Sequence, residues 1–157
     1  MVLRIFEVLL LEMESIFFEP TNIKLEWLNT YCKNTMSDFL GIEYIELGVD
    51  FLKAKMPVNE KTVQPLRMLN GGASLALAEC VGSLAANLVF DRTKWLALGL
   101  DLNGNHLRPV MEGAFVYGIA KPLHIGTTTQ VWEIRVETED GKLAHISRLT
   151  MAVKPRQ

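Results

Sequence analysis

The pattern of apolar and polar positions predicts one long buried helix in a chain that is otherwise mostly strands. From Gly71 or Gly72 to about Phe90, the residues are apolar or small on every side of a helix, with Glu79 as the exception. A helix that lacks a polar face is normally buried in a protein. This segment is therefore expected to form the centre of the domain.

A shorter amphipathic helix is predicted near the start of the chain. Leu25, Leu28 and Tyr31 recur at helical spacing, and Thr21-Asn22 offers an N-cap just before them. This helix is expected to run from about residue 22 to residue 33.

Six strands are predicted from alternating apolar and polar residues. Two precede the long helix and four follow it: residues 42–47, 51–56, 95–105 with a break near Gly104, 113–121, 130–138 and 143–153. Asp140-Gly141 is a strong hairpin signal between the last two strands. Strands joined by short turns pair antiparallel. The predicted fold is therefore α+β, with an antiparallel sheet wrapped around a long central helix. The side of the helix that one sheet leaves open is expected to meet a second copy of the chain.

Length, composition and charge narrow the class of protein. The chain has 157 residues, 49% hydrophobic and 22% charged, which fits one globular domain. Its net charge of -2 gives no basic excess that would recruit nucleic acid. Cys32 and Cys80 have no disulfide or metal-site spacing, and His106, His124 and His145 lie far apart. No metal site is expected, and a reducing cytoplasm is the simplest compartment.

The first residues are predicted to form an extension rather than a membrane span. The apolar run from Met1 to Leu11 is interrupted by Arg4 and Glu7, and it is too short to cross a bilayer. We expect residues 1–20 to be an N-terminal extension, which either packs on the domain as an extra helical turn or two or precedes a natural start at Met13, and residues 21–157 to form a single domain.

Glu79 is the main candidate for chemistry, because an unpaired carboxylate in a buried helix costs free energy. Gly71-Gly72 opens the same helix, where free N–H groups and a partial positive charge can hold a developing oxyanion. Glu79 lies two turns further along, too far to act with Gly71 without a substrate or a partner chain between them. The alternative is structural: Glu79 pairs with an Arg or Lys in the core, and the glycines allow close packing. The helix alone favours neither reading.

A family resemblance rests on a series of motifs in order along the chain. They are Pro57-Val58, Gln64-Pro65, Leu-Asn-Gly-Gly-Ala-Ser at 69–74, Ala78-Glu79, Gly82-Ser83, Asn-His-Leu-Arg-Pro at 105–109, Lys-Pro-Leu-His-Ile-Gly at 121–126, Gln-Val-Trp-Glu-Ile at 130–134 and Ser-Arg-Leu-Thr at 147–150. With these motifs the chain resembles the hotdog-fold acyl-CoA thioesterases, and within them the 1,4-dihydroxy-2-naphthoyl-CoA thioesterase (phenylacetate-type) branch. The resemblance covers roughly residues 21 to 153. Because the family's chains begin only a little before the first helix, it also implies Met13 as the preferred natural start.

The resemblance implies hydrolysis of an acyl-CoA thioester with an aromatic or bulky acyl group. Glu79 matches the catalytic carboxylate, Gly71 the glycine whose N–H polarises the carbonyl, and Gln64 a residue that orients the water or the thioester. Coenzyme A is part of the substrate, so no separate cofactor is implied. Positions implied to contact the substrate are Ser83, Gly99, His106, Leu107, Arg108, Pro109, His124, Ile125, Gly126, Thr127, Thr128 and Thr129.

The resemblance also implies a homo-oligomer, a dimer of dimers with the ligand at a subunit interface, and a role in menaquinone or phylloquinone synthesis. The chain departs from the family at Asn70, where the family has His before the two glycines. An Asn amide can donate a hydrogen bond, but it does not carry a proton near neutral pH. Thr127, Thr128 and Thr129 replace basic residues, so phosphate binding would depend on backbone N–H groups, hydroxyls and Arg108. These departures favour a rival function, a non-catalytic acyl-CoA-binding module.

Two further side chains are interpreted as structural. Cys80 has no His within a few residues to activate it, so burial and packing are expected. His145 is expected to point outward from the strand, opposite Ala144 and Ile146, and to have a structural role.

Overall fold

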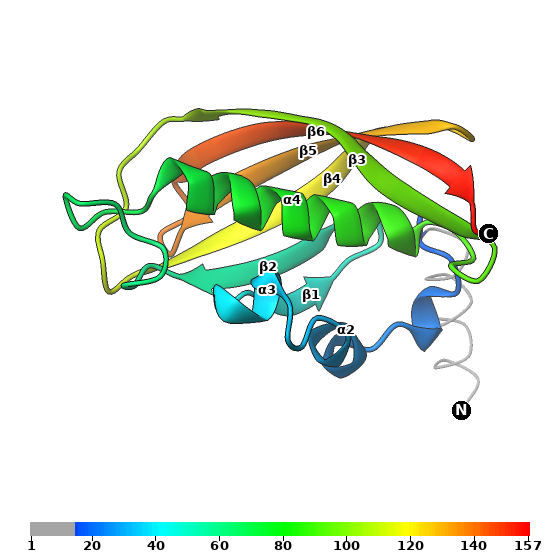
Figure 1. The fold of residues 1–157 in the computed structure, drawn as a ribbon, viewed down its shortest axis with the longest axis horizontal. Coiled ribbons are helices and arrows are strands. Elements are labelled where there is room, and N and C mark those ends of the chain that lie inside the picture. Colours follow the sequence, from blue (N-terminus) through cyan, green and yellow to red (C-terminus); the bar gives the residue numbers. More distant parts are fainter. Residues whose placement is uncertain (1–14) are drawn as a thin grey trace.

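The computed structural model describes residues 15–157, which form a curved antiparallel sheet around a long helix. The long helix is α4, Gly71–Leu88, and it lies in the hollow of the sheet (Figure 1). The six strands are β1 (Glu43–Leu47), β2 (Leu52–Pro57), β3 (Trp95–His106), β4 (Phe115–Ile125), β5 (Thr129–Thr138) and β6 (Leu143–Pro155). Their spatial order is β1-β2-β4-β5-β6-β3, which leaves β1 and β3 at the two edges. This is the predicted α+β hotdog arrangement. The preferred start at Met13 lies outside the described residues.

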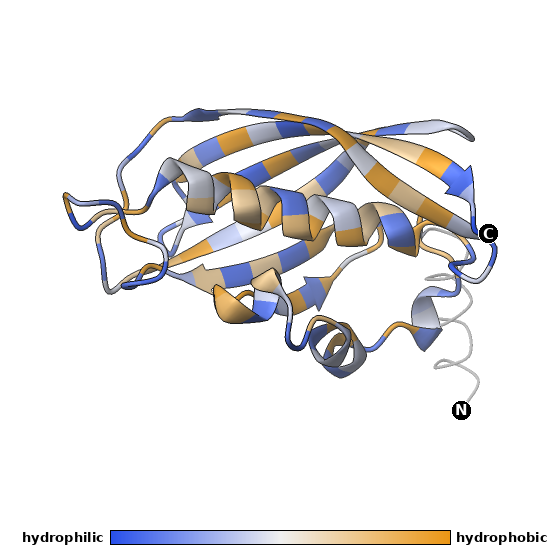
Figure 2. Ribbon diagram, viewed as in Figure 1, coloured by the Kyte–Doolittle hydropathy of each residue, from blue (hydrophilic) through white to orange (hydrophobic). Residues whose placement is uncertain are grey.

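The core lies between α4 and the concave face of the sheet. Alternation places Leu52, Ala54 and Met56 of β2 inside, as the sequence predicts. The strands show the same alternation of hydrophobic and hydrophilic residues in Figure 2. Trp132 of β5 and Leu77 of α4 are both fully buried in this core. The apolar surface removed from water here is the main stabilising contribution.

The beginning of the chain differs from the predicted helix of residues 22–33. Pro20–Asn22 forms a short 3-10 helix, η1, and the α-helix that follows, α2, spans only Leu25–Tyr31. Asn22 belongs to the first turn, where its Nδ2 donates to Glu19 Oε2 at 3.0 Å, so it does not cap α2. Helix α3, Met36–Phe39, is only one turn long and was not predicted. Phe17 is 3% exposed in the core, so the chain already packs on the domain before residue 20.

Strand β3 is continuous where a break near Gly104 was predicted. It pairs with β6 from Trp95 through His106, and its one register shift lies between Gly99 and Asp101. The predicted hairpin between β5 and β6 is confirmed. The Gly141 N–H donates to the Thr138 carbonyl at 2.9 Å, and Gly141 has a φ of 77°, a conformation that favours glycine.

Candidate active site

A pocket of about 320 Å³ lies at the N-terminal end of α4, and it gathers six of the residues singled out from the sequence. Gln64 comes from the loop before α4, Gly71 from the first turn of α4, and the remaining four from the end of β3 and the segment after it. The lining residues are Gln64, Met68, Leu69, Gly71, Ser74, His106, Leu107, Arg108, Pro109 and Ala144. Ser74 is 3% exposed and was not predicted, because a serine in an apolar helix gives no distinctive pattern.

The His106 ring lies directly against Gly71. Its Nε2 atom is 2.7 Å from the position that a Cβ atom would take on Gly71, and its Cε1 atom is 2.9 Å from that position. Any larger residue at 71 would overlap the ring. Glycine is therefore required here for close approach, and the backbone of the first helical turn and an imidazole share one wall of the pocket.

Hydrogen bonds at the start of α4 leave the Gly71 N–H free within the described chain. Asn70 is the N-cap: its Oδ1 accepts from the Gly72 N–H at 2.7 Å. Its carbonyl accepts from the N–H groups of Ala73 and Ser74. Among residues 15–157, no acceptor is found for the Gly71 N–H. A free N–H at a helix N-terminus suits an oxygen that gains negative charge.

Glu79 is half-buried on the side of α4 that faces β3. Its Oε1 accepts a hydrogen bond of 2.8 Å from the Ser83 hydroxyl, one turn further along. The same oxygen is 2.8 Å from the Cβ position of Gly99, so the predicted contact residues Ser83 and Gly99 both surround the carboxylate. Within the described residues Glu79 forms no ion pair, so the core salt bridge of the structural alternative is not found in this part of the chain.

Glu79 and Gly71 do not share one site within a single chain. They are separated by eight residues of helix, or about 12 Å at about 1.5 Å per residue. Ser83 lies one turn further away in the same direction. The carboxylate and the free N–H would meet across a substrate only if one of them came from another chain.

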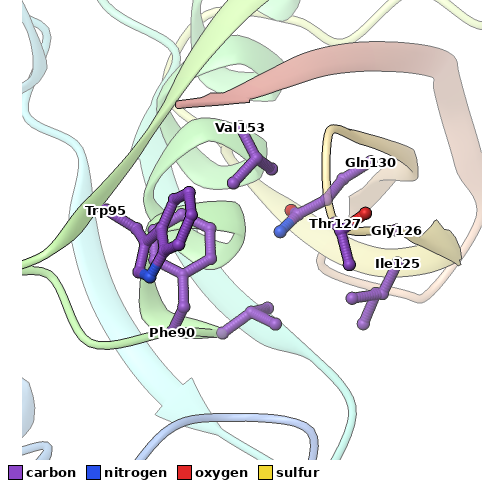
Figure 3. A pocket seen from close by; sticks show the side chains of 8 residues that line it. Phe90, Trp95, Ile125, Gly126, Thr127, Gln130 and Val153 are labelled. Carbon is purple, nitrogen blue, oxygen red and sulfur yellow. The ribbon is translucent and has the colours of Figure 1, made fainter. Parts of the chain in front are cut away.

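A second pocket, of about 410 Å³, lies at the opposite end of α4 (Figure 3). Its lining is mostly apolar and without charge: Val89, Phe90, Trp95, Ile125, Gly126, Thr127, Gln130 and Val153. The Gln130 Oε1 accepts from the Trp132 Nε1–H at 2.9 Å, which leaves its buried Nε2 without a partner in the described chain. Ile125, Gly126 and Thr127 were implied by the resemblance. The aromatic residues of this wall, Phe90 and Trp95, were not predicted to line a pocket.

The segment from His124 to Thr129 consists of the last two residues of β4, the turn at 126–128 and the first residue of β5. The Gly126 N–H donates to the Thr129 carbonyl at 2.9 Å, and the Thr128 carbonyl accepts from the Val153 N–H at 2.8 Å. His124 is exposed, with its Nε2 atom 2.7 Å from the Cβ position of Gly126. The segment is thus held by backbone bonds, and its three threonines offer hydroxyls rather than positive charge.

His145 is buried, so the prediction that it points outward is wrong. It is 1% exposed, and its Nδ1 atom lies 3.0 Å from the Nδ1 atom of His106. Its ring occupies the space that a side chain on Gly104 would need. Burial, with a smaller contribution from His106, lowers the pKa of His145 from 6.5 to about 4. The inward face of β6 holds His145, Ser147, Leu149 and Met151, so its first two residues are polar, and the apolar Ala144 and Ile146 on the other face led to the wrong prediction.

Comparison with known proteins identifies the family of this chain. The family model of the thioesterase superfamily matches residues 66–145, which include α4 and strands β3 to β5. The 1,4-dihydroxy-2-naphthoyl-CoA hydrolase of Escherichia coli is 44% identical over 131 residues, covering 83% of this chain and 95% of that protein. The chain belongs to the thioesterase superfamily.

Solved structures of two other thioesterases are similar over nearly the whole chain. A mutant thioesterase from Pseudomonas aeruginosa superposes with a TM-score of 0.86 at 42% identity, covering 90% of this chain and 100% of that one. A thioesterase from Haemophilus influenzae gives a TM-score of 0.85 at 42% identity, covering 90% and 96%. This chain is therefore a hotdog-fold hydrolase of the thioesterase superfamily.

The Cys80 thiol is not placed as a nucleophile in this thioesterase. Burial raises the pKa of Cys80 from 9.0 to about 11, so the thiol stays neutral, as the packing interpretation expects. In residues 15–157 no group of three or more His, Cys, Asp or Glu side chains is placed to hold a metal ion. Across the same residues, no helix has the length and apolar character needed to cross a membrane.

Proposed function

We propose that this thioesterase hydrolyses an acyl-CoA, with Glu79 as nucleophile or general base and the Gly71 N–H polarising the thioester carbonyl. Oxygen from water is added to the acyl carbon, the carbon–sulfur bond breaks, and the products are the free acid and coenzyme A. The observation that supports this most is Glu79 itself. It is a half-buried carboxylate that forms no ion pair with any of residues 15–157, and it is held by Ser83 and faces the sheet edge at Gly99.

We infer that the active site is completed by a second copy paired along β3. This edge strand is 12 residues long and has one charged residue, Asp101. Leu98 and Leu100 on it are 52% and 65% exposed. Natural proteins rarely leave a long apolar edge strand uncovered. A dimer through β3, assembled further into a dimer of dimers, would cover it.

The two-fold symmetry of such a dimer would bring the separated parts of the site together. Two copies of β3 pairing antiparallel run in opposite directions, so the His106 end of one lies beside the Trp95 end of the other. Glu79 lies near the middle of the seam, against Gly99. The pocket beside Gly71 in one protomer would then face Glu79 and the apolar pocket of its partner.

The two pockets support separate roles for the two parts of an acyl-CoA. His106, Leu107, Arg108 and Pro109 line the pocket next to Gly71, where Arg108 offers positive charge to a phosphate. The 124–129 segment offers N–H groups and threonine hydroxyls to the coenzyme. The uncharged wall of Phe90, Trp95 and Val153 favours an aromatic or bulky acyl group.

The name of the Escherichia coli relative suggests one candidate substrate. That protein is a 1,4-dihydroxy-2-naphthoyl-CoA hydrolase, and we propose the same naphthoyl thioester as a substrate to test here. A role in menaquinone or phylloquinone synthesis would follow from this substrate.

The decisive test is release of coenzyme A thiol by wild type and by Glu79→Gln, assayed with benzoyl-CoA and with 1,4-dihydroxy-2-naphthoyl-CoA. The amide keeps the size of the side chain but cannot attack or take a proton. We expect kcat to fall by about 1,000-fold or more, with an unchanged melting temperature. Near-normal turnover in the variant would remove Glu79 from the chemistry.

A non-catalytic acyl-CoA-binding module is the second candidate, favoured by the use of Asn70 as a helix cap and by the absence of basic residues at 127–129. Tight binding of a thioester by the wild type, without thiol release over a panel of acyl-CoAs, would support it.

A further inference from the structure

His106, His145 and Ser147 form a continuous chain of polar side chains that ends beside Gly71. His106 on β3 and His145 on β6 are directly opposite each other in the paired strands. Their Nδ1 atoms are 3.0 Å apart, and their ring centroids are 4.7 Å apart. On its other side, His145 Nε2 is hydrogen-bonded to the Ser147 hydroxyl. His106 Nε2, the far end of the chain, faces Gly71.

The contact between the two Nδ1 atoms requires one proton between them. If His145 Nδ1 carries it, His106 accepts there, and its own proton is on Nε2, toward the pocket. If His106 Nδ1 carries it, its Nε2 is an unprotonated acceptor. A neutral imidazole has one donor and one acceptor nitrogen, so the rest of the chain decides between these states.

Ser147 decides between them, because it is buried and has a single partner. It is 4% exposed, and in the described chain the one hydrogen bond of its hydroxyl is to His145 Nε2. A hydroxyl that only accepted this bond would leave its own proton unpaired away from water, which is costly. Ser147 therefore donates, and His145 Nε2 accepts. The lowered pKa of His145, about 4, keeps its ring neutral at neutral pH, so the ring carries one proton, and with Nε2 accepting that proton is on Nδ1.

We propose that Ser147 and His145 are positioning residues that fix His106 as the Nε2–H tautomer, so that it is a hydrogen-bond donor beside the Gly71 N–H. The three hydrogen bonds then point in one direction: Ser147 donates to His145, His145 donates to His106, and His106 donates into the pocket. Gly71 and His106 would together provide two donors for one substrate oxygen.

This pair of donors would supply the hydrogen bond to the substrate that Asn70 is not placed to supply. The Asn70 Oδ1 is engaged by the Gly72 N–H, and Asn70 does not line the pocket, whereas the His106 ring does. What the donor acts on rests on the proposed function, since a thioester carbonyl is the oxygen that would gain charge there. The tautomer itself does not depend on any substrate.

The direct test is nitrogen NMR of the full-length protein with ¹⁵N-labelled histidine at pH 7. The chain has only three histidines, so His124→Asn and His106→Asn assign the signals. We expect His106 to be protonated at Nε2 and His145 at Nδ1. A His106 ring protonated at Nδ1 would overturn the inference, whether or not the protein hydrolyses thioesters.

Two variants extend the test to turnover. Ser147→Ala removes the donor that orients His145, and His145→Leu removes the donor to His106. Each is expected to lower kcat about 10- to 100-fold, the range typical of residues that orient a functional side chain through a hydrogen bond, with KM changed less. His145→Asn can still donate from its amide to His106 Nδ1, and it should recover most of the lost kcat.

The outcomes separate this inference from the proposed hydrolysis. If Glu79→Gln abolishes thiol release while Ser147→Ala and His145→Leu leave kcat unchanged, the positioning role is wrong and the hydrolysis stands. If no acyl-CoA is hydrolysed but the NMR shows the expected tautomers, the hydrolysis is wrong and the proton arrangement stands. A His145→Asn variant as impaired as His145→Leu would contradict the donor role of residue 145.

Discussion

The Nε2 atom of His106 lies 2.7 Å from the point where a Cβ atom on Gly71 would be, so the ring and the first turn of α4 fit only because residue 71 is glycine. His106 is also held on its other side, because its Nδ1 atom shares a hydrogen bond with the Nδ1 atom of His145. The spacing between a backbone N–H and an imidazole is thus set by two strands and one helix.

Gly71→Ala is therefore expected to reduce activity without preventing folding. The methyl group would push the His106 ring by about 1 Å, and a displacement of that size can cost about 100-fold in rate. Turnover of benzoyl-CoA and the melting temperature are the measurements. Gly72→Ala is the matched control, because its Cβ would approach only the Asn70 Oδ1, at 3.1 Å. Equal effects of the two substitutions would contradict a specific role for the contact with His106.

A second substitution tests the packing around Glu79. A Cβ atom on Gly99 would be 2.8 Å from Glu79 Oε1, so Gly99→Ala should displace the carboxylate and lower kcat by about 10-fold or more. Gly99→Ala combined with Glu79→Gln separates this cause from others. If Gly99 acts through Glu79, the double variant should be no slower than Glu79→Gln alone. A further loss in the double variant would show that Gly99 acts by another route.

Asn70 has a structural role that its position in the motif did not reveal. Because its Oδ1 caps α4, Asn70→Ala should lower the free energy of unfolding by about 1 kcal/mol. Asn70→Asp keeps the capping oxygen and removes the amide donor. Urea unfolding and thiol release measured on both variants separate the two roles. We expect Asn70→Asp to be as stable as wild type, and a loss of activity in it would show that the amide donor matters to turnover.

Secondary structure was predictable wherever periodicity ran for many residues. The apolar stretch of α4 and the alternation in β2 leave one arrangement that buries the hydrophobic side chains. The start of α2 and the one-turn α3 were not predictable in the same way. Their few residues carry a weak pattern, and Asn22 was used in the preceding 3-10 turn.

Site residues were predictable where they carry a motif, but their contacts were not. Glu79 stood out as a charge in an apolar helix, and the glycines before it indicated a close approach. His145 carries no motif, and Ser147, the first residue of the 147–150 motif, gave no sign of its partner, because their roles come from the strand pairing that places His145 opposite His106. Register across 39 residues of sequence is a tertiary property, and a single sequence does not encode it in a local pattern.

His145 should also affect how stability depends on pH. Its pKa of about 4 in the folded protein is below the value of 6.5 for an unperturbed histidine. The unfolded chain therefore takes up the proton first as the pH falls, and stability is lost between about pH 6.5 and pH 4, by up to about 3 kcal/mol. Urea unfolding of wild type and His145→Asn over this range measures the difference. The curve for the variant should fall less steeply, and His124→Asn, which removes an exposed histidine, should follow wild type. Parallel curves for wild type and His145→Asn would contradict the buried, neutral state of His145.

If the active site is shared between two protomers, mixing two inactive variants should restore activity, whereas a site within one protomer would stay inactive. Glu79→Gln and Gly71→Ala are each expected to inactivate their own homodimer. In a mixed dimer, one site would receive Gly71 from the first variant and Glu79 from the second, and it would be intact. Refolding the two variants together at equal concentration should therefore restore up to about a quarter of the wild-type rate, since about half the dimers are mixed and each has one intact site. Leu100→Lys, at the exposed edge of β3, should abolish this recovery by separating the protomers, which size-exclusion chromatography with light scattering would detect. Recovery would be absent if both residues acted within one chain, because every chain in the mixture would then carry a lesion.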